Sequence, residues 1–194
     1  MSEPRSIVVR KIISGGQTGV DRGALDAAIE LGLEHGGWCP MGRLAEDGFI
    51  PTRYALRQTD TDKYSDRTER NLLEADGTLI FYRRELSGGT DLTRLLCQRH
   101  RRPLLLVDLA RGSDAAKSDA AKIQTWFTDQ QIVTLNVAGP RESTSPGIAA
   151  AAKQALLESL RCCKGHGDRV VLHGSDSECG EHRNQSSTTN SVEF

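Results

Sequence analysis

Short apolar segments alternate with segments of helical periodicity from residue 7 to residue 160 of this chain. The apolar segments, which we predict to be strands, are residues 7–13, 78–82, 103–108 and 132–137, and a further short strand is predicted around Trp38. The predicted helices are residues 18–33, 65–75, 90–100, 113–130 and 148–160. Such alternation is typical of right-handed βαβ units, which produce a mostly parallel sheet with helices on both faces. The sequence therefore predicts an α/β fold in which ligands bind at the carboxyl ends of the strands.

Two glycine-rich turns each join a predicted strand to a predicted helix, at residues 14–22 (SGGQTGVDR) and residues 87–93 (SGGTDLT). A turn of this kind directs several unpaired backbone N–H groups at one point, beside the positive end of the helix dipole. Glycine also lets a ligand approach the backbone without a Cβ atom in the way. Together the two turns predict a site for a small phosphorylated ligand.

The first turn offers several groups to such a ligand. Gly16 and Gly19 would give access to the backbone, and the hydroxyl group of Thr18 could donate a hydrogen bond. Arg22 could pair with a phosphate. Asp21 would instead suit a ribose hydroxyl, a magnesium ion or the helix cap, because a carboxylate does not bind phosphate directly.

The second turn and the segment before it add further candidates. Gly88 and Gly89 precede Thr90, which we expect to cap the following helix. In the helix at residues 65–75, Arg67 could neutralise a phosphate, and Glu69 or Asn71 could face the ligand. A carboxylate at Glu69 could hold a hydroxyl group or act as a general base.

The spacing of the glycines excludes two common nucleotide motifs. No Lys-Ser or Lys-Thr pair follows Gly19, as a Walker motif requires, and the first turn does not match GxGxxG. The sequence therefore gives no support for ATP hydrolysis or hydride transfer. Residues 40–64 form a long irregular segment that contains Phe49, Tyr54 and Tyr64, and these aromatic side chains predict an ordered, packed loop.

The charge balance argues against binding to a polyanion. Lys and Arg total 25 against 26 for Asp and Glu, so we expect neither nucleic acid nor a membrane surface as a partner. No apolar stretch is long enough to span a bilayer, and the N-terminal residues lack the apolar core of a secretory signal. An odd number of cysteines, five, argues against a disulfide framework. We therefore expect a cytoplasmic protein.

The composition changes near residue 163. We predict one domain over residues 1–162, followed by a mostly disordered polar tail over residues 163–194, which is rich in Gly, Ser, Asn, Thr and charged residues. The Cys and His residues of the tail match no standard zinc spacing, so no metal site is predicted.

Several motifs taken together resemble a known family. They are Ser14-Gly15-Gly16-Gln17-Thr18-Gly19-Val20-Asp21-Arg22, Gly37-Trp38-Cys39-Pro40, Glu46-Asp47-Gly48, Tyr64-x-x-Arg67-Thr68-Glu69-x-Asn71, Asp76-Gly77-Thr78, Gly88-Gly89-Thr90 and Asn136-Val137-Ala138-Gly139-Pro140-Arg141. In this order they are similar to the putative molybdenum carrier family, the circularly permuted YpsA-like branch of the SLOG superfamily. The resemblance covers about residues 11–160.

The resemblance implies a Rossmann-like three-layer fold and a nucleotide or nucleotide-derived ligand. In related carriers the ligand is molybdenum cofactor (molybdopterin), a pterin that bears a phosphate. By the same analogy the protein forms a homo-oligomer. The ligand would be held by Gly15, Gly16, Gln17, Thr18, Gly19, Asp21, Arg22, Gly88, Gly89, Thr90, Asn136 and Arg141, and the candidate catalytic residues are Arg67 and Glu69.

Three functions remain open on the sequence. The first is a carrier or binding protein that holds a phosphorylated ligand between the two glycine turns. The second is a hydrolase that cleaves an N-glycosidic or phosphoester bond of a nucleotide derivative with Glu69. Related phosphoribohydrolases carry Thr-x-x-Glu in the glycine loop, whereas Thr93 stands in place of that glutamate here, which favours binding without turnover. The third is a ligand-sensing interaction module whose tail contacts a partner.

Overall fold

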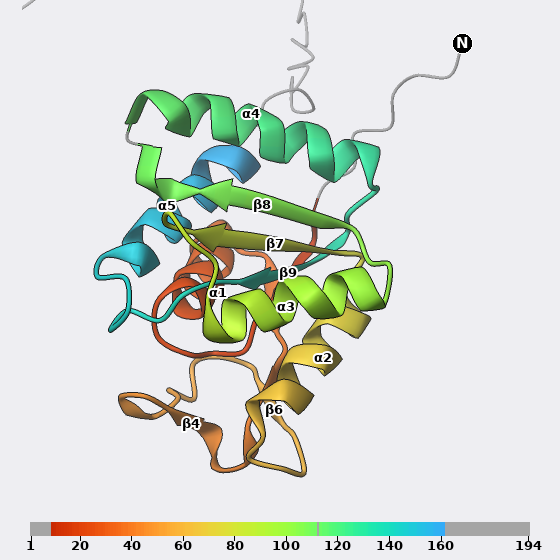
Figure 1. The fold of residues 1–194 in the computed structure, drawn as a ribbon, viewed down its shortest axis with the longest axis vertical. Helices are drawn as coiled ribbons and strands as arrows, with labels where there is room; N and C mark the ends of the chain where they lie inside the picture. Colours follow the sequence, from red (N-terminus) through yellow and green to blue (C-terminus); the bar gives the residue numbers. More distant parts are fainter. Residues whose placement is uncertain (1–8, 112, 162–194) are drawn as a thin grey trace, which may run out of the picture.

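A five-stranded parallel sheet forms the centre of the computed structural model, which describes residues 9–111 and 113–161 (Figure 1). Its spatial order is β2-β1-β9-β7-β8, and every neighbouring pair is parallel. The strands are β1 (Lys11–Ile13), β2 (Glu34–Gly36), β7 (Gly77–Tyr82), β8 (Leu104–Asp108) and β9 (Thr134–Ala138). The predicted parallel α/β sheet is thus confirmed.

The α-helices of the described residues cover both faces of this sheet. One layer consists of α1 (Val20–Leu31), α4 (Ser113–Asp129) and α5 (Ile148–Arg161), and the other of α2 (Tyr64–Glu74) and α3 (Gly88–Arg99) (Figure 1). The chain leaves β1 through α1 toward one edge of the sheet, and it leaves β7 through α3 toward the opposite edge. Right-handed crossovers in opposite directions place their helices on opposite faces. The Rossmann-like three-layer prediction is therefore confirmed.

The larger hydrophobic core lies between the sheet and the layer of α1, α4 and α5. It joins strand residues such as Leu79 and Val137 to Leu156 of α5. Small residues let α1 and α5 approach closely, since a Cβ atom on Gly23 would lie 2.3 Å from the carbonyl oxygen of Ala149. This contact fixes the position of α1, which directly follows the first glycine turn.

The chain between β2 and α2 forms ordered structure outside the main sheet. The strand β3 (Trp38–Cys39) pairs in parallel with β6 (Arg57–Gln58), and β4 (Leu44–Ala45) and β5 (Gly48–Phe49) form a small hairpin. A 3-10 turn, η1 (Met41–Arg43), leads into this hairpin, and a second, η2 (Leu109–Arg111), follows β8.

The side chain of Arg43 organises this outer segment from within. Its guanidinium group donates hydrogen bonds to four carbonyl oxygens of the segment, those of Ile50, Pro51, Tyr54 and Leu56. The side chains of Ile50 and Tyr54 are buried against Leu25 of α1. The prediction of an ordered, packed loop is therefore confirmed, although Phe49 is 58% exposed.

The first helix is shorter than predicted. It ends at Leu31, because Gly32 adopts the left-handed conformation with φ of 66° and its N–H group bonds back to carbonyl oxygens of the helix. The residues after it form β2, a strand that the sequence did not reveal. Only Gly36 of β2 is buried, so this edge strand lacks an apolar signal.

The predicted helix caps are wrong at two places. Ser87 precedes α3, so Thr90 lies inside the helix. Gly19 precedes α1, and the carboxylate of Asp21 bonds elsewhere. Residues 7 and 8 of the first predicted strand and the predicted tail, residues 163–194, lie outside the described residues. None of the helices in the described part of the chain is long and apolar enough to cross a membrane.

Candidate functional site

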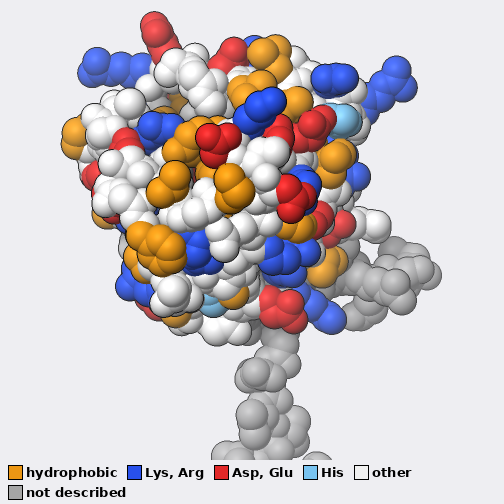
Figure 2. Space-filling model, turned by 90° about the horizontal axis from the view of Figure 1, so that it is seen from below, with side chains coloured by type: hydrophobic (Ala, Val, Ile, Leu, Met, Phe, Trp, Pro, Cys, Tyr) orange, Lys and Arg blue, Asp and Glu red, His pale blue; other side chains and the backbone are white. Residues whose placement is uncertain are grey.

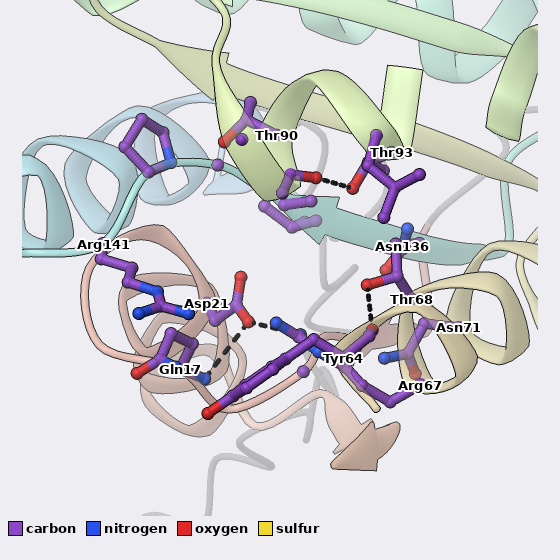
Figure 3. Close-up of a pocket in the computed structure, with 18 of the residues that line it drawn as sticks. Gln17, Asp21, Tyr64, Arg67, Thr68, Asn71, Thr90, Thr93, Asn136 and Arg141 are labelled. Carbon is purple, nitrogen blue, oxygen red and sulfur yellow. Dashed lines mark hydrogen bonds and ion pairs between the residues drawn. The ribbon is translucent and has the colours of Figure 1, made fainter. Parts of the chain in front are cut away.

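A cavity of about 330 Å³ opens near the carboxyl ends of β1, β9 and β7 (Figure 3). Here successive crossovers leave the sheet in opposite directions, which is where open α/β folds bind ligands. The first glycine turn, α2, the N-terminus of α3 and the segment after β9 each form part of the wall. The predicted site residues that line the cavity are Gly15, Gln17, Asp21, Arg67, Gly88, Gly89, Thr90, Asn136 and Arg141.

The N-terminus of α3 forms one end of the cavity. Gly88 and Gly89 are its first two residues, and N–H groups at this position have no partner within a helix. A Cβ atom on Gly89 would meet no heavy atom within 4 Å, so the space beside this backbone is open. Thr90 and Thr93 are buried beneath it, and the Thr93 hydroxyl donates to the Gly89 carbonyl oxygen at 2.9 Å. This end of the cavity is suited to an anion.

A buried ion pair crosses the floor of the cavity. Arg67 Nη1 lies 2.9 Å from Asp21 Oδ2, and the two side chains are 15% and 6% exposed. The same carboxylate oxygen accepts a hydrogen bond from the backbone N–H of Gln17. A Cβ atom on Gly15 would lie 1.2 Å from Arg67 Nη1. Gly15 is therefore needed because the guanidinium group lies directly on its backbone.

Gln17 carries a buried donor without an acceptor. Its Oε1 accepts hydrogen bonds from the backbone N–H groups of Thr18, at 3.0 Å, and Glu46, at 2.9 Å. These two donors fix the orientation of the amide, so Nε2 cannot exchange places with Oε1. Within the described residues Nε2 has no hydrogen-bond partner, and neither has Arg67 Nε, although both atoms are buried. Such an orphaned donor costs about 1–3 kcal/mol, which an acceptor on a ligand would recover.

Two cavity residues of α2 were not predicted as site residues. Tyr64 and Thr68 line the wall together with Arg67 and Asn71. The four positions are i, i+4, i+3 and i+7 of one helix, so they share one face, and this periodicity could have identified them from the sequence. The amide of Asn71 is occupied on both sides, because it accepts from the N–H of Trp38 at 2.7 Å and donates to the Trp38 carbonyl oxygen at 3.0 Å.

Arg141 lies at the mouth of the cavity (Figure 3). Its Cζ atom is 5.4 Å from the centre of the Tyr64 ring, and Arg67 Cζ is 5.8 Å from the same centre. Among the described residues, no carboxylate forms an ion pair with Arg141, whereas Arg67 is paired with Asp21. Arg141 therefore brings a positive charge that is not neutralised by a direct partner.

Four residues predicted to bind the ligand do not line the cavity. A Cβ atom on Gly16 would lie 2.4 Å from Leu56 Cδ1, and one on Gly19 would lie 2.3 Å from the Pro140 carbonyl oxygen. These glycines permit close packing of the protein on itself. The Thr18 hydroxyl donates to Glu46, and Arg22 forms a two-pronged ion pair with Asp47 at 2.6 and 2.7 Å.

The candidate catalytic carboxylate also lies elsewhere. Glu69 does not line the cavity, and its Oε1 atom is 2.6 Å from His100 Nε2 at the end of α3. Arg67, the second candidate, does line it. Asp21 is the one carboxylate among the described residues that line the cavity, and it is already paired with Arg67.

Charges on the outer surface are mixed in sign. Figure 2 views the molecule from the side of the β4–β5 hairpin, and basic and acidic side chains are interspersed on this face.

No group of three or more His, Cys, Asp or Glu side chains in the described ranges could hold a metal ion. Cys39 is buried away from the cavity, and burial raises the pKa of its thiol. The cavity itself therefore offers N–H and hydroxyl donors rather than metal ligands.

Comparisons with known proteins agree with this architecture. The sequence model of the Circularly permutated YpsA SLOG family matches residues 12–160. A crystal structure titled "Putative molybdenum carrier protein", from Syntrophus aciditrophicus, is similar with a TM-score of 0.75 and 45% sequence identity, over 79% of this chain and 95% of that chain. The comparison with curated proteins gives no match. Because the family model covers most of the sequence, the chain belongs to the circularly permutated YpsA family of SLOG proteins.

Proposed function

We propose that the protein binds a phosphorylated small molecule in the cavity at the N-terminus of α3, and that this molecule is molybdenum cofactor or a nucleotide. The observation that carries the proposal is that one cavity is lined both by an open helix N-terminus and by Gln17, whose buried Nε2 donor has no acceptor in the described structure. A helix N-terminus alone is a general feature of α/β folds. A second donor in the same cavity lining that lacks an acceptor favours a bound ligand with anionic or acceptor groups.

The charges of the cavity support the same conclusion. Arg67 and Arg141 line it against one carboxylate, that of Asp21. Since Arg67 and Asp21 neutralise each other, Arg141 supplies the net positive charge. A phosphate at α3 would gain from the helix dipole and from Arg141 within a partly enclosed space.

The lining residues suit molybdenum cofactor as a cargo through its organic part. The relative from Syntrophus aciditrophicus is titled a molybdenum carrier, and a phosphate-bearing pterin presents both an anion and hydrogen-bonding ring atoms. The backbone of Gly88 and Gly89 and the Thr90 hydroxyl would hold the phosphate, and Gln17 would donate to an acceptor atom. No thiol lines the cavity within the described residues, so the contacts made by this chain would be to the phosphate and the pterin.

Binding is favoured over hydrolysis by the positions of the carboxylates. A general base must lie within hydrogen-bond reach of the proton it removes. Glu69 is paired with His100 outside the cavity, and Thr93 uses its hydroxyl within α3. The arrangement therefore holds a ligand without presenting an unpaired carboxylate to it.

Titration calorimetry of the full chain tests this proposal with molybdenum cofactor, adenosine monophosphate and guanosine monophosphate. We expect at least one of them to bind, and we expect Arg141→Ala to weaken that binding by roughly tenfold or more, because the cavity loses the positive charge that no carboxylate partner neutralises.

The control variant is Arg57→Ala. Arg57 is also exposed and also lies over an aromatic ring, 4.2 Å from the centre of Trp38, but it does not line the cavity. Its replacement should leave the affinity unchanged. Absence of binding by every phosphorylated compound, or equal affinities of the wild type and Arg141→Ala, would contradict the proposal.

A further inference from the structure

We propose that Tyr64 is a stacking platform for a planar ring of the ligand, so that the site selects phosphorylated heterocycles over bare oxyanions and over phosphorylated sugars. This inference rests on the proposed function, since it assumes that the phosphate lies at α3. It adds a required feature of the ligand and the residue that recognises it.

Tyr64 presents an accessible aromatic side chain to the cavity. It is the first residue of α2, its ring lines the cavity, and it is 40% exposed. In Figure 3, Tyr64 and Thr90 lie on opposite sides of the view, with Asp21 between them. A ligand whose phosphate lies near Thr90 therefore extends past Asp21 toward the aromatic ring.

Asp21, between Thr90 and Tyr64, suits an uncharged part of the ligand that links its phosphate to its ring. Asp21 Oδ2 accepts from Arg67 and from the Gln17 backbone, whereas Oδ1 forms no hydrogen bond among the described residues. Figure 3 shows this second oxygen directed toward the side of Thr90. It can accept a hydrogen bond from a hydroxyl or N–H group, and it would repel a second anion. The chemical order along the cavity is then anion, neutral donor, aromatic ring.

The Arg141 guanidinium group lies over the Tyr64 ring without an ion-pair partner among the described residues. Its Cζ atom lies 5.4 Å from the ring centre. Arg67 is restrained by Asp21, so Arg141 is the arginine that can move. A planar ring could enter beside Tyr64 and be covered by the guanidinium plane, since both groups stack well on aromatic surfaces.

The volume of the cavity also favours a ligand larger than a bare oxyanion. The cavity measures about 330 Å³, within the range of sites for organic ligands. A bare tetrahedral oxyanion occupies on the order of 100 Å³, a few times the volume of one water, and would leave most of the cavity to solvent. The apolar side chains of Leu92 and Pro140 in the wall would then face water without a partner.

The test compares guanosine monophosphate with ribose 5-phosphate, which carries the same phosphate and sugar but no base. Calorimetry is done with the wild type and with Tyr64→Phe and Tyr64→Ala. The wild type should bind the nucleotide roughly 5- to 150-fold more tightly than the sugar phosphate, the range that stacking of one base on an aromatic side chain gives. Tyr64→Phe should keep this ratio, and Tyr64→Ala should bring it close to one without changing the affinity for ribose 5-phosphate.

Phe49→Ala provides the matched control. Phe49 is an exposed aromatic residue that also has an arginine over its ring, Arg43 at 5.7 Å, and it does not line the cavity. This variant should keep the wild-type ratio. If Tyr64→Ala does not fold, as judged by circular dichroism, Tyr64→Leu replaces it, because leucine retains apolar volume but offers no aromatic face.

The outcomes separate the two proposals. Equal wild-type affinities for the nucleotide and the sugar phosphate, or an unchanged ratio in Tyr64→Ala, would overturn the role of Tyr64 and leave phosphate binding intact. Binding of molybdate or inorganic phosphate as tightly as the nucleotide would also overturn it. Absence of binding by all phosphorylated compounds would instead overturn the proposed function.

Discussion

At the scale of single residues, the glycines of the two turns have different physical roles. The Arg67 guanidinium group fills the space that a Cβ atom on Gly15 would need, and the Pro140 carbonyl oxygen fills the corresponding space at Gly19. Gly89 has no neighbour within 4 Å of the place where a Cβ atom would stand, although it lines the cavity. The first turn therefore needs glycine for the fold itself, whereas nothing in the described structure explains the glycine at position 89 except access to the backbone.

Replacing Gly89 by alanine should separate stability from binding. The backbone there has no positive φ, so alanine should stabilise the helix by up to about 1 kcal/mol. The added methyl group should at the same time block a phosphate from the N–H groups of α3 and weaken binding by roughly tenfold or more. Urea unfolding and calorimetry of one preparation check both effects. A variant that gains stability and keeps full affinity would show that the ligand does not contact this backbone.

The limits of sequence reasoning are clearest for the polar residues. Asp21, Arg67 and Asn136 line one cavity. The sequence itself indicates Asp21, in the first glycine turn, and Arg67, in the helix at residues 65–75, as candidates, whereas only the family resemblance indicates Asn136. The sequence could not show that Arg22 pairs with Asp47 or that Glu69 pairs with His100. These partners come from elements far apart in the chain, and the direction of a side chain on a helix depends on which face packs inward.

At the scale of elements, the β4–β5 hairpin acts as a clamp on the first glycine turn. The Glu46 carboxylate accepts hydrogen bonds from the Thr18 hydroxyl and from both the N–H and hydroxyl of Ser143. The Glu46 backbone N–H sets the orientation of the Gln17 amide. The hairpin thus joins the first turn to the loop after β9, which carries Arg141. Its polar tip is a structural support for the cavity rather than a part of its wall.

Glu46→Gln should weaken this clamp in a pH-dependent way. Hydrogen bonds from Ser143 and then Thr18 hold the pKa of Glu46 below its ordinary value of 4.5. A carboxyl whose pKa is lower in the folded state stabilises the fold above about pH 4.5, and this contribution is lost as the pH falls through the folded-state pKa. Near neutral pH we expect the free energy of unfolding of the wild type to exceed that of the variant by about 0.5–1 kcal/mol. This difference is modest because the carboxylate is exposed to solvent.

Urea unfolding of both proteins over a pH series measures that difference directly. Other carboxylates titrate in the same range, but their effects are common to both proteins and cancel in the difference. The gap should shrink steadily below about pH 4.5. A difference that stays constant from neutral to acidic pH would show that the Glu46 charge does not support the clamp.

Strands were predictable where their sequence is a continuous apolar run. The strand β7 is buried over almost its whole length and was identified to within one residue, as was β8. The edge strand β2 was missed, because it exposes Glu34 and contributes only backbone pairing to Lys11 and its neighbours in β1. The hairpin was missed for a related reason, since Leu44 and Phe49 are 52% and 58% exposed and give no alternating pattern.

At the scale of the whole molecule, the described residues 9–111 and 113–161 contain the larger hydrophobic core and the sheet edge that bears the cavity. The larger cluster runs from Val9 at its start to Leu160 near the end of α5, and the family match spans residues 12–160. The match to the crystallised relative covers 79% of this chain and 95% of that chain. The described sheet, its helices and the described lining of the cavity thus all come from residues 9–161.

A chain that stops at Arg161 should consequently keep both properties. Its thermal midpoint should lie within about 2 °C of that of the full chain, because no side chain of the core is removed. Its affinity for the phosphorylated ligand should equal that of the full chain, because every residue that lines the cavity is retained. Differential scanning calorimetry and titration of the two proteins side by side provide the measurements. If the shortened chain folds but loses affinity, residues 162–194 contribute to the site, and the division between domain and tail predicted from composition is wrong. If affinity persists, residues 1–161 suffice for binding.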